Sequence, residues 1–119
     1  MIKYRIKNDN LIKGIKKELS DNDLNGIVAA DHKVTDDLYN PIACLLCCSR
    51  GIAVFDEPEE SQTHNPNVAY ELGMLHLLGR ETLILKHNSL DALHTDILMK
   101  LYSSYGDINE ALGKVRGWI

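Results

Sequence analysis

Short apolar segments alternate with helical segments along this chain of 119 residues. Residues 27–31, 52–56 and 82–86 are nearly uninterrupted apolar runs of strand length, and the first two end in an aspartate. Continuous apolar strands are typical of a parallel sheet covered on both faces, whereas a sheet with one wet face alternates apolar and polar residues. The sequence therefore predicts an α/β fold: a flavodoxin-like or Rossmann-like three-layer domain with a small parallel sheet.

Amphipathic helices are predicted between these strands, because apolar residues recur there at the three- and four-residue spacing of a helix. Residues 11–19 are predicted to form the first helix. A second helix, running towards Ser49, either follows the capping residues 35–37 or begins or kinks at Pro41, behind Asn40. Pro66, behind the capping Asn65, begins the third helix, and Gly79 closes it. Each predicted helix is thus long enough to cover one face of the sheet.

The two ends of the chain give weaker strand patterns. Residues 2–6 form a poor first strand interrupted by lysine and arginine, so this strand is predicted to be weak or missing. A short last strand is expected within residues 101–105, and a capping box at residues 107–110 begins the last helix. The buried face of that helix is predicted to contain Ile108, Ala111, Leu112, Val115 and Ile119. We expect residues 1–119 to form one domain, because the chain is too short for two.

The net charge, the apolar runs and the cysteines limit the partners and the cellular compartment that can be expected for this chain. The formal net charge of −4 offers no attraction to a phosphate backbone or an anionic membrane, so no direct nucleic-acid or membrane partner is expected. No apolar run approaches the ~20 residues of a membrane span, and the start of the chain lacks the pattern of a secretory signal, so cytoplasmic localisation is expected. Cys44, Cys47 and Cys48 are interpreted as reduced, buried thiols, because three clustered cysteines make a poor disulfide framework.

Ligands of open parallel sheets bind beyond the carboxyl ends of the strands, where loops and helix starts meet. Asp31, Asp56 and the residues that enter the third helix are all predicted at that edge. Glu71 stands out because it lies on the border of the buried stripe of this helix. That stripe is predicted to consist of Val68, Leu72, Leu75 and Gly79. A half-sheltered carboxylate suits hydrogen bonding to sugar hydroxyls or stabilisation of a developing positive charge, although a solvated helix glutamate is the commoner case.

The other residues of the third helix, and the remaining histidines and cysteines, are weaker candidates for a functional role than Glu71. Tyr70 is either a stacking platform for a ring or an ordinary surface tyrosine. His76 stands roughly 140° around the helix from Glu71, so the two cannot pair and His76 is given no catalytic role. The remaining histidines and the cysteines lack the paired spacing of a zinc site, and no Walker or dinucleotide glycine motif occurs. We therefore expect no metal site.

Residues 51–56 (GIAVFD), a polar loop, and residues 65–73 (NPNVAYELG) together resemble the bacterial TIR-like nucleotide-binding domains, whose relatives include the nucleoside 2-deoxyribosyltransferases. The segments at 95–97 and 101–102 and the closing 118–119 resemble the end of such domains, so the resemblance runs from Leu11 onwards. It implies a flavodoxin-like sheet and places Glu71 at the glutamate with which these enzymes cleave an N-glycosidic bond.

Three functions follow from that resemblance as expectations. The first is an NAD-cleaving effector of bacterial antiviral defence that needs no cofactor, uses NAD as its substrate and works as a homo-oligomer or within a larger sensor assembly. Glu71 then stabilises an oxocarbenium-like ribose, and Asn67, Asp56 or Asp31 help to place hydroxyl groups. Asn65 and Tyr70 are further candidate substrate-binding residues. The second is a nucleoside deoxyribosyltransferase or N-glycosidase with Glu71 as nucleophile. The third is a non-catalytic nucleotide-sensing or assembly module.

Overall fold

The computed structural model describes residues 2–3, 9–28, 39–56, 66–90 and 102–119, apart from the side chains of residues 2–3, 39–41 and 66–67. Its elements in chain order are β1 (Ile2–Lys3), α1 (Asp9–Ser20), α2 (Tyr39–Cys47), β2 (Arg50–Phe55), α3 (Pro66–Leu77), β3 (Glu81–His87), β4 (Tyr102–Tyr105) and α4 (Ile108–Trp118). No helix in the described ranges is long and apolar enough to cross a membrane.

The strands form one open sheet in the order β1-β2-β3-β4, and every pair of neighbours runs parallel. β2 and β3 pair from Arg50 opposite Glu81 to Phe55 opposite Lys86, so their carboxyl ends are level. Of the weak first strand predicted at residues 2–6, the structure describes Ile2 and Lys3, which pair with Ile52 and Ala53 of β2, and residues 4–6 lie outside the described residues. An α/β fold on a small parallel sheet is thereby confirmed.

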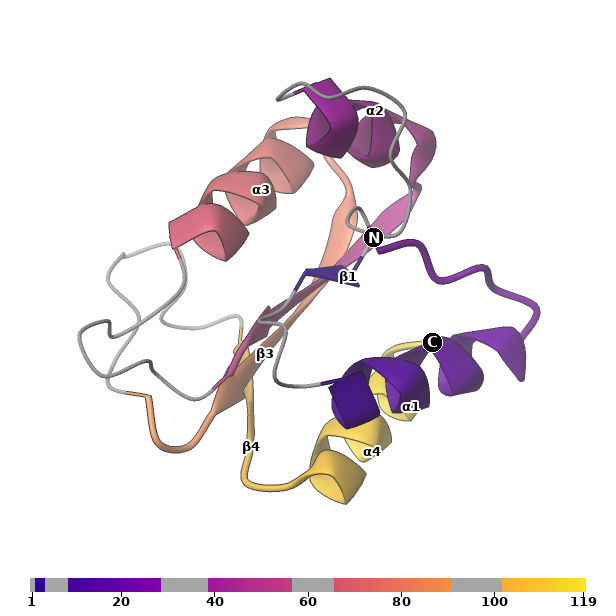
Figure 1. The fold of residues 1–119 in the computed structure, drawn as a ribbon, viewed down its shortest axis with the longest axis vertical. Coiled ribbons are helices and arrows are strands. Elements are labelled where there is room, and N and C mark those ends of the chain that lie inside the picture. Colours follow the sequence, from indigo (N-terminus) through magenta and orange to yellow (C-terminus); the bar gives the residue numbers. More distant parts are fainter. Residues whose placement is uncertain (1, 4–8, 29–38, 57–65, 91–101) are drawn as a thin grey trace.

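Helices cover both faces of the sheet (Figure 1). Ile52 and Val54 of β2 pack with residues of α1 and α4, whereas Ala53 and Phe55 pack with Val68 and its neighbours on α3. Successive side chains of a strand point to opposite faces, and all four of these β2 residues are at most 3% exposed. Burial on both faces explains why this strand is an uninterrupted apolar run.

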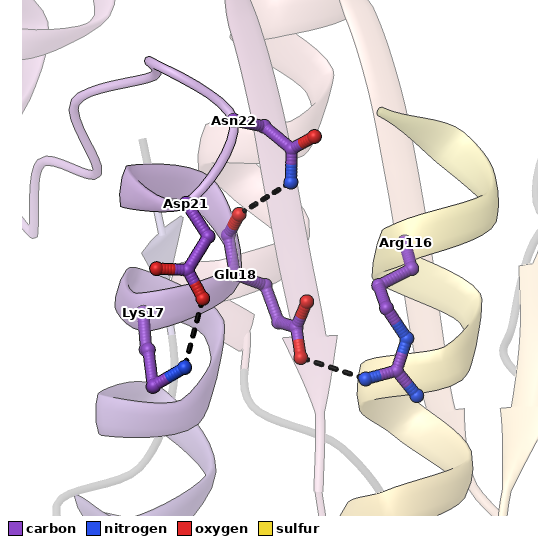
Figure 2. A network of polar contacts seen from close by, with 5 residues as sticks. All are labelled: Lys17, Glu18, Asp21, Asn22 and Arg116. Atoms are coloured by element: carbon purple, nitrogen blue, oxygen red, sulfur yellow. Dashed lines mark hydrogen bonds and ion pairs between the residues drawn. The ribbon is translucent and has the colours of Figure 1, made fainter.

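Polar contacts stabilise the end of α1 and connect α1 to α4 (Figure 2). Arg116 Nη1 lies 2.7 Å from Glu18 Oε1, and Asn22 Nδ2 donates to the Glu18 carbonyl at 2.9 Å. Lys17 Nζ donates to Asp21 Oδ2 at 2.8 Å, and this hydrogen bond raises the pKa of Lys17 above its usual value. Of these contacts, only the Arg116–Glu18 pair connects segments that are distant in the sequence.

Three expectations about buried faces are wrong. Ile108 is 41% exposed, because the first residue of α4 lies beyond the cover of α1 and the sheet. Gly79 ends the third helix as predicted, but it lies in an exposed turn with φ +65° and not in the buried stripe. Cys47, the last residue of α2, is exposed, while Cys44 and Cys48 are buried; the three cysteines form no disulfide with one another.

Several predicted segments lie wholly or partly outside the described residues. Residues 29–31 of the strand predicted at 27–31, the capping residues 35–37 and Leu101 belong to this group. Val28 is described, as a single bridge residue that is 1% exposed within the cluster formed with α1 and α4. The start of the predicted strand 27–31 therefore lies in the core.

Asp107 caps α4, and its removal is expected to destabilise the domain. Asp107 Oδ1 accepts from the Glu110 backbone N–H at 2.8 Å, while Glu110 Oε2 accepts from the Gly106 N–H at 2.7 Å. Asp107→Ala removes the acceptor of the Glu110 N–H and is expected to lower the free energy of unfolding by about 1 kcal/mol in urea denaturation. Asp107→Asn keeps an acceptor oxygen, so an equal loss in both variants would contradict the capping role.

Candidate functional site

The candidate site lies at the carboxyl edge of the sheet, where β2 and β3 end and the chain enters α3 (Figure 1). α3 begins at Pro66, as predicted, because proline fixes a helical φ and lacks the N–H that a first-turn residue leaves unbonded. The helix then runs back over β2 and β3, which it contacts. Its first half therefore lies next to the carboxyl ends of these strands.

Glu71 is in the second turn of α3 and is only 5% exposed, with Oε2 excluded from solvent. The sequence predicted a half-sheltered side chain on the border of the buried stripe, so Glu71 is more deeply buried than expected. Met74 and Leu75 pack against Cys44, Leu45 and Cys48 on this side of α3, which widens the buried stripe towards Glu71. A carboxylate inside a fold is costly to desolvate, which marks Glu71 as an unusual helix glutamate.

Asp56 follows β2 directly and is 2% exposed. In the register of the sheet, Phe55 lies opposite Lys86, so the next residue, Asp56, comes level with His87. Phe55 packs against α3, and alternation along the strand directs the following side chain towards the other face. Asp56 thus occupies the predicted edge, on the side of the sheet that α1 and α4 cover.

Lys86 is a charged residue of this edge that sequence reasoning missed. This lysine of the largely apolar strand β3 is only 8% exposed, and its Nζ lies 5.4 Å from the centre of the Tyr102 ring. Ile84, two residues earlier, packs with α3, so Lys86 lies on the α3 face. A lysine within a strand otherwise buried on both faces was the available signal, because lysine is rarely buried.

His87 and Tyr105 form a second group at the same edge that was not predicted. The two residues are opposite each other in β3 and β4, and their rings meet edge to face with centres 5.3 Å apart. Ser89 donates its backbone N–H to His87 Nδ1 at 3.1 Å. A backbone N–H only donates, so Nδ1 is the acceptor of this hydrogen bond.

The other predicted site residues are not brought to this edge by described contacts. Tyr70 is 69% exposed on the outer side of α3, about 100° around the helix from Glu71. The backbone of Asn67 belongs to the first turn of α3, but its side chain is outside the described part of the structure. Asp31 and Asn65 lie entirely outside the described residues.

Neither His76 nor the three cysteines are part of this site. His76 Nε2 lies 2.9 Å from Thr82 Oγ1, which ties α3 to the start of β3. Within the described ranges, no three histidine, cysteine, aspartate or glutamate residues are grouped so as to hold a metal ion. These groups therefore add nothing to the site at the carboxyl edge.

Comparisons with family models, with curated proteins and with solved structures found no match to this chain. The function must therefore be argued from the site itself. Two buried carboxylates, a lysine side chain and an imidazole ring lie in or around one end of the sheet. Such a set can bind hydroxyl groups and anionic groups, and its carboxylates can stabilise positive charge.

Proposed function

We propose that the domain cleaves the N-glycosidic bond between nicotinamide and ribose in NAD, with Glu71 as the key carboxylate. The observation that carries this proposal is the burial of Glu71 on α3, the helix that starts after the carboxyl end of β2. In the segment of residues 65–73, which resembles TIR-like domains, this glutamate is the position at which the family cleaves glycosidic bonds.

A flavodoxin-like arrangement of the sheet is part of the proposal. The parallel order β1-β2-β3-β4 supports it, because the strand predicted at 27–31 is proposed to pair with β1 on the side that β2 does not occupy. The buried bridge residue Val28 is consistent with such a strand. Asp31 and Asp56 would then end neighbouring regions of the same edge.

In the proposed reaction, the bond between the ribose and the nicotinamide nitrogen breaks and its electron pair leaves with nicotinamide. The ribose becomes oxocarbenium-like, and Glu71 stabilises its positive charge. Water then adds to the same carbon and loses a proton, so that the products are nicotinamide, ADP-ribose and a proton. Asp31, Asp56, Asn65 and Asn67 are proposed to place the hydroxyl groups of the sugar.

Self-association is proposed to make Glu71 accessible, because a side chain that is 5% exposed must be uncovered before it can touch a substrate. The outer side of α3 supports association: Tyr70 is 69% and Leu77 87% exposed, and a methyl group added at Gly73 between them would meet no atom within 4 Å. Large exposed apolar side chains on one helix face are typical of contact surfaces. An antiviral effector that becomes active on assembly fits this arrangement.

The test is to incubate the purified protein with NAD, and separately with deoxynucleosides, over a wide range of protein concentrations. Released nicotinamide or free base is then quantified by chromatography. We expect nicotinamide and ADP-ribose from NAD, with a rate per molecule that rises with protein concentration. Turnover of deoxynucleosides alone, with a glycosyl-enzyme detected by mass spectrometry, would instead support the nucleoside transferase. Turnover of neither substrate by the assembled protein would support a non-catalytic module.

A further inference from the structure

A pocket of about 320 Å³ lies at the amino-terminal edge of the sheet, at the opposite end of β2 from Asp56. It is formed by the end of α1, residues 24–27, the turn between α2 and β2, and the last turn of α4. In Figure 1 these segments lie at the right and upper right, whereas β2 and β3 end at the lower left. The pocket is thus separate from the proposed NAD site.

The pocket has one cationic group beside an aromatic ring. Arg50 is the only charged residue among the described residues that line it, and its guanidinium carbon is 5.5 Å from the centre of the Trp118 ring. Arg50 Nε also lies 3.2 Å from Glu81 Oε2, but both side chains of this pair are about half exposed, at 40% and 57%. Exposed ion pairs contribute little, so a ligand carboxylate can compete with Glu81 for the guanidinium.

Several of the described residues that line the pocket are apolar. Leu19 and Ile52 are 6% and 3% exposed in the core that α1 shares with the sheet, and Trp118 packs against the same cluster. Pockets for small molecules combine such an apolar lining with a few polar groups that fix orientation. A pocket near the lower end of their usual range of ~300–1,000 Å³ suits a ligand with a single ring or a short chain.

We propose that this pocket binds a small molecule that carries a carboxylate on an apolar body. The carboxylate lies at the Arg50 guanidinium, whose planar fork matches a carboxylate with two parallel hydrogen bonds. The apolar body lies against Trp118 and Ile52. Among the described residues that line the pocket none has an anionic side chain, and Glu81, which pairs with Arg50, is not one of them.

Trp118 reports on the pocket directly, because it is the only tryptophan of the chain. The experiment titrates the full chain with benzoate and follows tryptophan fluorescence, with acetate and benzamide as comparison probes. We expect a saturable change with benzoate and a dissociation constant below about 1 mM. Acetate lacks the apolar body and benzamide lacks the charge, so both should bind at least about tenfold more weakly.

Arg50→Gln removes the charge and is expected to weaken benzoate binding at least about tenfold. Arg116→Gln is the matched control, because it removes one positive charge from the helix that carries Trp118 but does not line the pocket. Its dissociation constant should equal that of the unmodified chain. Equal affinity in Arg50→Gln, or no saturable response to benzoate in the unmodified chain, would overturn the proposal.

A second measurement does not depend on the folding of a variant. Cys47 lines the pocket and is exposed, whereas Cys44 and Cys48 are buried, so N-ethylmaleimide should modify Cys47 first. Benzoate is expected to slow this alkylation severalfold, and acetate at the same concentration is not. Alkylation of Cys47 at the same rate with and without saturating benzoate would count against binding in this pocket.

Discussion

Glu71→Gln is expected to lower the rate of NAD cleavage by at least about 100-fold, the size of loss seen when one electrostatic stabiliser of a transition state is removed. Glutamine has nearly the same shape as glutamate, so it fits the buried position, which is 5% exposed in the unmodified chain. Its neutral amide cannot stabilise a positively charged ribose. The measurement is nicotinamide release at equal protein concentration, together with thermal unfolding of both proteins.

Glu81→Gln is the matched control for this experiment. Its side chain is 57% exposed at the start of β3, at the other end of the sheet, and its ion pair with Arg50 is of the weak surface kind. The control should cleave NAD as fast as the unmodified chain. If folded Glu71→Gln also kept full activity, both the NAD hydrolase and the nucleoside transferase would be excluded, since each depends on this carboxylate.

The order of elements could be predicted from local signals. Pro66, which follows an asparagine in the sequence, predicts the start of α3. β2 is a continuous apolar run because its residues are buried on both faces of the sheet. Asp107 likewise marks the start of α4, because its side chain accepts from the Glu110 N–H. Each of these signals depends on residues that are close in the sequence, which is why they could be recognised without a structure.

The composition of the site depends on contacts between distant segments and could not be predicted in the same way. Met74 and Leu75, on the same side of α3 as Glu71, pack against residues of α2, and the sequence of α3 alone does not indicate where α2 packs. Lys86 lies against Tyr102, a contact that requires β3 and β4 to be neighbours. The helical pattern identified Val68, Leu72 and Leu75 as buried residues of α3, but it did not indicate that Glu71 is only 5% exposed.

Gly51→Ala is expected to lower the free energy of unfolding by about 1–3 kcal/mol, the usual cost of overpacking a core. A Cβ at Gly51 would come within 2.4 Å of Leu75 Cδ1 and 3.1 Å of Cδ2. Leu75 is itself only 2% exposed, so its side chain has little room to move away. The loss should appear in urea denaturation as a lower midpoint with an unchanged slope.

Gly73→Ala is the matched control, since it adds the same methyl group where no atom lies within 4 Å. Gly73 lies inside α3, so alanine should stabilise the domain by about 0.5–1 kcal/mol through helix propensity.

A double mutant tests the contact itself, because Leu75→Ala removes both methyl groups that would clash with the new Cβ. In that background Gly51→Ala should cost much less than it does alone, which is the sign of direct coupling between the two positions. If the losses of the two single mutants simply add, glycine is required at position 51 for its backbone conformation and not because Leu75 approaches it closely. The close packing of α3 on β2, which also positions Glu71 over the sheet, would then need another explanation.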